Sequence, residues 1–227
     1  MMAHMIVVHH LNNSRSQRVL WMLEELGLAY EVKRYERDRK TMLAPEELAL
    51  VHPLGKSPVI TDEGVTIAES GAILEYLAER YGKGALAPAA GTADKRQFNY
   101  WMHYAEGSLM PLLLLKLVFA RVEKGPMPFF VKPVAKGICG SVNKQFIAPR
   151  LSQHLNFVEA ELAKMPWFSG AEFGAADIQM SFPLEAAAAR SGVDTMPHIG
   201  KFLERIHARP AYKRALERGG AYEILEA

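Results

Sequence analysis

The chain has 227 residues, enough for one large domain or two smaller ones with a buried core. Its net charge of +2 gives no reason to expect a nucleic-acid or acidic-membrane partner, and we expect the charges to be interspersed without a basic run. Cys139 is the only cysteine, which excludes an intrachain disulfide, a cysteine-based zinc cluster and a CxxC redox pair. A single cysteine also favours a reducing compartment.

No segment has the length of a membrane-spanning helix. The longest apolar run, from Leu109 to Leu115, contains Pro111 and is closed by Lys116, whereas a span needs roughly 20 residues. The first ten residues lack the basic start of a signal peptide, and residues 1–4 are set aside in predicting the fold. These observations predict a cytoplasmic protein without a membrane span.

The first 82 residues alternate between strand and helix patterns. A β-branched run at 6–9 predicts a strand, and apolar residues then recur at helical spacing until Gly27, a typical helix C-cap. Further elements are expected as strands at 30–35, 58–61 and 65–68, a short helix at 46–51 and an amphipathic helix at 73–81. A strand-helix-strand unit followed by a hairpin predicts a mixed α/β sheet domain of the thioredoxin-like type over residues 1–82.

The rest of the chain has the pattern of an all-helical domain, which we place at 92–227. Glycines and small residues at 82–92 predict a linker, and apolar stripes at helical spacing follow it. Three prolines and two phenylalanines at 125–133 predict an irregular break between two long helices. Gly174 and Asp177 fit the start of a later helix, with Gly174 as its N-cap.

Ser14 is the first candidate functional residue, because it lies where the first strand gives way to the first helix. A helix N-terminus has unpaired N–H groups and a partial positive charge, so it favours an anion. A hydroxyl at this place can donate a hydrogen bond to a bound thiolate. Serine is also a frequent N-cap, and a purely structural role is the alternative.

The second candidate is the segment around Ser57 and Pro58. Pro58 begins a predicted strand, which is unusual unless the preceding peptide bond is cis or the strand lies at a sheet edge. A cis bond would turn the backbone of Ser57 outward, where it could pair with an extended peptide ligand. An ordinary trans loop proline is the alternative, and the sequence leaves the isomer open.

The third candidate is Glu69 and Ser70, directly before an amphipathic helix. Ser70 can cap the helix, the free N–H groups beside it can hold a carboxylate, and Glu69 can hold an ammonium group. Simple capping is again the alternative. Taken together, the three places suit a small zwitterionic peptide that carries a thiol.

Three motifs resemble the N-terminal domain of glutathione S-transferases. They are Ser-Arg-Ser-Gln-Arg-Val-Leu at 14–20, His-Pro-Leu-Gly-Lys-Ser-Pro-Val at 52–59 and Ala-Glu-Ser-Gly-Ala-Ile at 68–73. The resemblance is strong over 5–82 and points to a serine-type bacterial and fungal subgroup, since no tyrosine stands near the end of the first strand. It is looser after residue 92. Asp177 matches the acidic residue that family members usually have in the first turn of a buried helix of the second domain. Gly174, however, stands where the family usually has Ser or Thr, and residues 125–150 depart from the family pattern.

The resemblance implies roles for seven residues of the first domain. Ser14 would activate the thiol of glutathione, and Arg15 would add positive potential near the sulfur, unless it is merely solvated. The residues implied in glutathione binding are Lys56 at the glycyl carboxylate, Ser57 and Pro58 at the cysteinyl backbone, and Glu69 and Ser70 at the γ-glutamyl end.

An electrophile pocket is expected between the domains. We predict that the helix after the linker supplies its walls, through Tyr104, Met110, Leu113, Leu114 and Leu117. An apolar stripe at helical spacing is equally typical of a buried core, and that alternative stays open.

The resemblance implies a glutathione transferase that attacks hydrophobic electrophiles with the activated thiolate. Glutathione would be a co-substrate, no cofactor or metal is expected, and the role would be detoxification by a cytoplasmic homodimer. One alternative is peroxide or disulfide reduction on the same site, although the absence of a cysteine at position 14 argues against a mixed disulfide there. The other is a non-catalytic binding or assembly module, for which there would be no need to keep Ser14, Pro58, Glu69 and Ser70 together.

Overall fold

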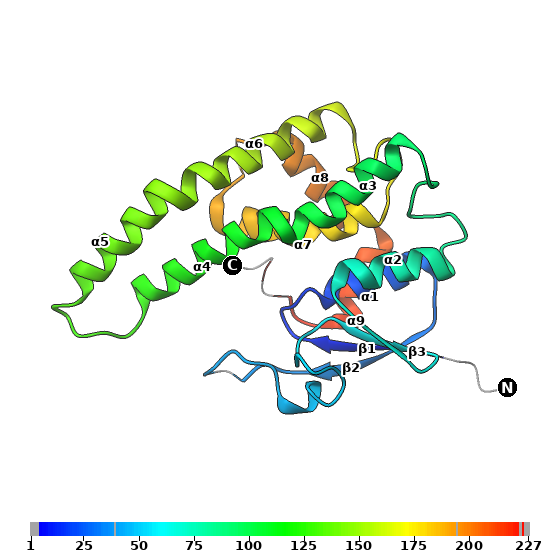
Figure 1. Cartoon of the computed structure of the whole chain (residues 1–227), viewed down its shortest axis with the longest axis horizontal. Helices are drawn as coiled ribbons and strands as arrows, with labels where there is room; N and C mark the ends of the chain where they lie inside the picture. Colours follow the sequence, from blue (N-terminus) through cyan, green and yellow to red (C-terminus); the bar gives the residue numbers. More distant parts are fainter. Residues whose placement is uncertain (1–4, 39, 194, 223, 225–227) are drawn as a thin grey trace.

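The computed structural model describes residues 5–38, 40–193, 195–222 and 224. Within them the chain forms a small sheet domain followed by a helical region (Figure 1). The outermost residues of the two expected domains, 1–4 and 225–227, lie outside the described residues. No helix in the described part of the chain is long and apolar enough to cross a bilayer.

The first domain has a mixed four-stranded sheet in the order β2-β1-β3-β4. β1 is parallel to β2 and antiparallel to β3, and β3 is antiparallel to β4, which confirms the predicted thioredoxin-like arrangement. The elements are β1 (Ile6–Leu11), α1 (Ser16–Leu26), β2 (Tyr30–Tyr35), the 3-10 helix η1 (Glu46–Leu48), β3 (Val59–Asp62), β4 (Val65–Ala68) and α2 (Ser70–Tyr81).

Two boundaries near the predicted site differ from expectation. β1 extends to Leu11 because β2 pairs with it along its whole length, so that His10 lies opposite Arg34. α1 begins at Ser16, two residues after Ser14, because the Ser14 carbonyl and hydroxyl already accept bonds from the N–H groups of residues 17 and 16. The predicted end of this helix is confirmed, since Gly27 has a left-handed φ of 64°.

The second region is helical, as predicted, and the break after residue 124 is confirmed. Figure 1 shows α4 and α5 running side by side and projecting away from the rest of the molecule. The elements are α3 (Ala93–Tyr104), the π-helix η2 (Ala105–Leu109), α4 (Met110–Lys124), α5 (Lys132–Val142), the π-helix η3 (Asn143–Ile147), α6 (Ala148–Lys164), α7 (Ala175–Ser191), α8 (Pro197–Ala208) and α9 (Pro210–Gly219).

The start of α7 explains why this chain has glycine where its resemblance predicts Ser or Thr. A Cβ on Gly174 would lie 3.0 Å from the carbonyl oxygen of Leu86, which accepts a hydrogen bond from the Ala175 N–H. The Asp177 carboxylate instead ties this corner together, accepting from the N–H groups of Gly174 at 2.8 Å and Phe168 at 2.9 Å. Burial raises the pKa of Asp177 to about 7.

One apolar core runs through both regions, and α1 lies at its centre. Residues of α1 and α2 belong to the same buried cluster as residues of α7 and α8. α1 packs closely on α9, where Trp21 meets the Tyr212 ring edge-to-face with 5.0 Å between ring centroids. A Cβ on Gly219 would lie only 2.7 Å from Gln17 Oε1, so the Gln17 side chain would have to shift to accept a larger residue here. The helical region therefore fixes the position of α1, and with it the turn that carries Ser14.

Candidate active site

The Ser14 hydroxyl lies in the turn between β1 and α1 and is 4% exposed. Its oxygen accepts a hydrogen bond from the Ser16 N–H at 3.2 Å and lies 2.7 Å from the Ser16 hydroxyl. It is also 3.5 Å from the hydroxyl of Ser57, which is 43 residues away in the chain. The structure therefore brings two predicted site residues together. Ser14 is not the N-cap of α1, contrary to the structural alternative, because Arg15 occupies that position without a side-chain cap.

A buried polar row continues from Ser14 into the protein. Ser16 Oγ lies 2.9 Å from Nδ1 of His10, and both residues are buried. Burial, and next the nearby Arg34 guanidinium, lower the pKa of His10 to about 4, against a smaller opposing effect of a hydrogen bond with the Gly219 backbone. His10 is therefore neutral at pH 7. Sequence reasoning missed both residues, although a histidine at the end of a buried strand was a signal.

The loop before β3 has the geometry that the sequence left open. The Ser57–Pro58 peptide bond is cis, so the trans alternative was wrong. The Ser57 hydroxyl donates to the His9 carbonyl at 2.9 Å and accepts from the Leu11 N–H at 3.3 Å, which ties the loop to β1. Pro58 is buried, and Lys56 is exposed.

Glu69 and Ser70 occupy the turn from β4 into α2. Glu69 has a φ of 72° and a ψ of 120°, an uncommon backbone conformation for a residue with a side chain, and it is exposed. Ser70 is buried, and its hydroxyl accepts a hydrogen bond from Arg18 Nη2 at 2.8 Å. The Ser70 side chain therefore does not cap α2, contrary to the simpler alternative, and the backbone N–H groups at this helix start have no side-chain cap.

Arg18 links the first domain to the helical region. Its guanidinium is 1% exposed and donates to three acceptors: Ser70 Oγ at 2.8 Å, the Gln179 carbonyl at 2.6 Å and Glu106 Oε1 at 2.6 Å. Burial alone would raise the pKa of Glu106, but Arg18 and then Arg15 lower it, so the carboxylate stays ionised. Glu106 was not identified from the sequence, because it lies 88 residues from Arg18.

Arg15 lies in an ion pair and is not simply solvated. Its Nε donates to both carboxylate oxygens of Glu106 at 2.9 Å, and its guanidinium lies 5.0 Å from the centroid of the Phe182 ring. Its positive charge is therefore partly balanced by Glu106 before any ligand binds.

The five predicted electrophile-pocket residues differ widely in burial. Tyr104 is buried, and its hydroxyl is 2.6 Å from Nδ1 of His154 on α6. Met110 and Leu113 lie in the main core, as the structural alternative proposed, whereas Leu114 is 50% exposed. Leu117 is partly exposed. Burial therefore divides the five residues between the core and the solvent-exposed surface.

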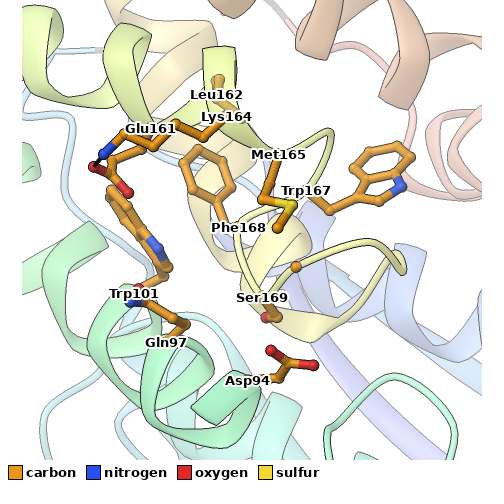
Figure 2. A pocket seen from close by; sticks show the side chains of 11 residues that line it. Asp94, Gln97, Trp101, Glu161, Leu162, Lys164, Met165, Trp167, Phe168 and Ser169 are labelled. Atoms are coloured by element: carbon orange, nitrogen blue, oxygen red, sulfur yellow. Dashed lines mark hydrogen bonds and ion pairs between the residues drawn. The ribbon is translucent and has the colours of Figure 1, made fainter.

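Two cavities are found elsewhere, and none of the five residues lines either. The smaller, about 220 Å³, lies in the helical region; Figure 2 shows Trp101, Phe168 and Met165 around it, with the Asp94 carboxylate beside Ser169. The larger, about 440 Å³, is a polar hollow beside β1, β2 and the end of α9. Its lining includes His10, so it adjoins the polar row that leads to Ser14.

Comparisons with known proteins agree on one family. The family model described as "Glutathione S-transferase, N-terminal domain" matches residues 3–79, and the one described as "Glutathione S-transferase, C-terminal domain" matches residues 147–210. Glutathione S-transferase 3 of Schizosaccharomyces pombe is 37% identical over 94% of this chain and 88% of its own length. The disulfide-bond oxidoreductase YfcG of Escherichia coli is 28% identical over 93% and 94%.

A solved structure supports the same conclusion for the whole fold. A glutathione S-transferase from Actinobacillus pleuropneumoniae is 32% identical to this chain, with a TM-score of 0.77, and the match covers 97% of this chain and 95% of the other. The family models, the relative from fission yeast and this structure together show that the chain belongs to the glutathione S-transferase family.

Proposed function

We propose that the protein is a glutathione transferase in which the Ser14 hydroxyl stabilises the glutathione thiolate for attack on a hydrophobic electrophile. The observation that carries the proposal is the meeting of Ser14 with the cis Ser57–Pro58 loop, 3.5 Å between the two hydroxyl oxygens. A ligand thiol beside Ser14 would then lie next to the Ser57 backbone. The family name of the relatives supports the same reaction.

The energy needed for activation is modest. A free thiol with a pKa of about 8.5 is only about 3% ionised at pH 7, and lowering this pKa by roughly 2 units raises the thiolate fraction about 25-fold. That change needs about 2.7 kcal/mol of preferential thiolate binding. A hydrogen bond from Ser14 and the N-terminus of α1 can supply it, since each contributes about 0.5–3 kcal/mol. Ser14 need not accept a proton to do this.

The remaining contacts of glutathione are proposed from the family motifs and the local geometry. The Ser57 backbone would pair with the cysteinyl residue, with Pro58 behind it. The γ-glutamyl carboxylate would bind the uncapped N–H groups at the start of α2, near Ser70, and the exposed Glu69 carboxylate would hold its ammonium group. Lys56 is exposed and would face the glycyl carboxylate.

Detoxification of hydrophobic electrophiles by a cytoplasmic homodimer belongs to the same proposal. This part is supported by the resemblance to the family alone. Sedimentation at micromolar concentration tests the assembly, since a species near 25 kDa would contradict the dimer.

Glutathione-dependent disulfide or peroxide reduction is a second candidate, because one relative is named a disulfide-bond oxidoreductase. Cys139 is buried on α5, so every reactive thiol in such a reaction would come from glutathione. Parallel assays with a nitroaryl chloride and with a small dialkyl disulfide separate the two activities.

The proposed function is tested by titrating the ultraviolet thiolate absorbance of bound glutathione against pH. We expect a bound thiol pKa well below 8.5 in the wild type and a return towards the free value in Ser14→Ala. Binding of S-methylglutathione, which has no thiol, serves as the control and should be unchanged. An unshifted thiol pKa in the wild type, or full conjugation by Ser14→Ala, would contradict the assignment of Ser14.

A further inference from the structure

The helices α4 and α5 and the loop between them, residues 110–142, form a projection that we call the arm. Figure 1 shows the loop at the far end of the arm. The arm lies between the segments that match the two family models, which end at 79 and begin again at 147. Neither family model therefore covers the arm itself.

The arm exposes apolar side chains to an unusual degree. At its tip Phe129 is 83% and Phe130 is 68% exposed, and their rings meet edge-to-face at 5.6 Å between centroids. Nine of the nineteen exposed large apolar residues in the described part of the chain belong to the arm. The other seven are Leu114, Leu115, Val118, Val122, Val131, Val134 and Ile138. A concentration of exposed apolar side chains on one segment indicates an interaction site.

The arm is also basic, which the whole-chain net charge conceals. Its sequence holds five basic residues and Glu123 as its only acidic residue, a net charge of +4 in a chain whose total is +2. The segment contains no continuous basic run, and its charge comes from the scarcity of acidic residues. Lys124 ends α4 and Lys132 begins α5, so two lysines flank the aromatic tip.

The basic side chains near the tip are available to a partner. Arg121, Lys124, Lys132 and Lys136 are exposed, and none has an ion-pair partner among the described residues. Lys116, nearer the body of the protein, is half-buried and donates to Ser191 Oγ at 3.0 Å. Free positive charge thus concentrates where the aromatic rings are most exposed.

We propose that the arm docks the protein on an anionic lipid surface. Phe129 and Phe130 enter the boundary between headgroups and acyl chains, and the four basic residues contact lipid phosphates. Membrane attachment without a spanning helix requires apolar burial and electrostatic attraction together, and the arm tip has both. Contact between the arms of two copies fits less well, because it would place +4 against +4.

Co-sedimentation of the full chain with vesicles tests this proposal. We expect the wild type to pellet with phosphatidylcholine vesicles that contain phosphatidylserine, and to bind at least tenfold more weakly to phosphatidylcholine alone. Higher salt should weaken the binding, since it screens the charges. A wild type that stays in the supernatant with both vesicles overturns the proposal.

Two double variants divide the contributions, and each has a matched control. Phe129→Ser with Phe130→Ser, and Lys124→Glu with Lys132→Glu, should each lower partitioning at least tenfold while leaving the circular dichroism spectrum unchanged. Leu50→Ser with Leu54→Ser removes exposed apolar residues outside the arm, and Lys201→Glu with Lys213→Glu changes exposed lysines of α8 and α9. Both controls should bind vesicles like the wild type. Unchanged binding by either arm variant would contradict the proposal.

Sedimentation velocity supplies the alternative outcome. The wild type could sediment as a dimer and fail to bind vesicles, while the variant with Phe129→Ser and Phe130→Ser sediments as a monomer. In that case the arm is a subunit interface and the lipid proposal is wrong. These readouts do not depend on conjugation, so they stay informative if the proposed activity fails.

Discussion

The hydroxyl oxygens of Ser14 and Ser16 lie 2.7 Å apart, and the Ser16 hydroxyl lies 2.9 Å from Nδ1 of His10. The hydrogen bond between His10 and the Gly219 backbone favours a protonated ring nitrogen. We therefore assign Nε2 of His10 as the donor to the Gly219 carbonyl. Nδ1 of the neutral ring is then an acceptor for the Ser16 hydroxyl. It follows that the Ser14 hydrogen has the Ser16 oxygen as a competing acceptor, in addition to the glutathione sulfur.

Ser16→Ala should therefore lower the pKa of the bound glutathione thiol. The change removes the competing acceptor, and one hydrogen bond of about 1 kcal/mol corresponds to about 0.7 pKa units. The ultraviolet titration of bound glutathione measures the shift. In a protein that already carries Ser14→Ala, adding Ser16→Ala should leave the thiol pKa unchanged. A thiol pKa that rises in Ser16→Ala alone would show that Ser14 does not donate to Ser16.

His10 should make the fold less stable in mild acid. Its pKa is about 4 in the folded protein, below the 6.5 of an ordinary histidine, so the unfolded chain binds the extra proton between these values. The free energy of unfolding therefore falls as pH is lowered from 6.5 to 4, by at most about 3 kcal/mol from this residue. Urea denaturation of the wild type and His10→Gln at pH 7 and pH 5 measures the contribution.

Asp177 acts in the opposite direction, which makes the comparison between variants necessary. Its folded-state pKa of about 7 lies above its ordinary value, so its contribution to stability is lost as pH rises through that range. Both proteins contain Asp177, so its effect cancels when the pH dependence of the free energy of unfolding is compared between the wild type and His10→Gln. If the two proteins show the same pH dependence, the role assigned to His10 is wrong.

Arg18→Met should destabilise the protein far more than Arg15→Met. Arg18 is almost fully buried and satisfies acceptors on three helical segments, and loss of such a buried charge partner costs about 3–5 kcal/mol. Arg15 pairs with Glu106 nearer the surface, where an ion pair contributes about 1 kcal/mol or less. Urea denaturation at neutral pH compares the two, and equal losses would contradict this ranking.

Two glycine-to-alanine changes should have opposite signs. At Gly219 a new Cβ would lie 2.7 Å from Gln17 Oε1 and 3.1 Å from Leu20 Cδ1, and such overpacking costs about 1–3 kcal/mol. At Gly200, within α8, nothing lies within 4 Å of the added atom, and alanine should stabilise the helix by about 0.5–1 kcal/mol. Thermal melting of both variants measures the difference. A Gly219→Ala protein as stable as the wild type would show that the Gln17 and Leu20 side chains can move away from the added atom.

The parts of the fold that depend on local pattern were predictable. The β-branched residues of β1 and the stripe of α1 with Gly27 indicate their elements directly, because period and capping are local properties. The motif around Ser57 and Pro58 also indicated a loop near Ser14, and the two hydroxyl oxygens lie 3.5 Å apart. Its isomer was not predictable, because the tertiary contacts that favour cis over trans are not visible in the sequence.

The rest could not be predicted, because it depends on which distant residues meet. Arg18 and Glu106 are 88 residues apart, and Glu106 lies in a π-helix, where helical spacing misplaces a side chain. Leu113 and Leu114 are adjacent in one apolar run, yet the first is core and the second is half-exposed. The apolar character of that run gave no information about which side chains line a pocket.

The Arg18 guanidinium has consequences for how this gene can be divided. A fragment that ends at the linker would keep Arg18 and Ser70 but lose Glu106 and the Gln179 carbonyl, leaving an unbalanced cation on an exposed apolar face. Transplanting the first 82 residues onto a foreign helical region would create the same defect. Recombination between family members is therefore expected to succeed only when both halves bring matching partners for this arginine.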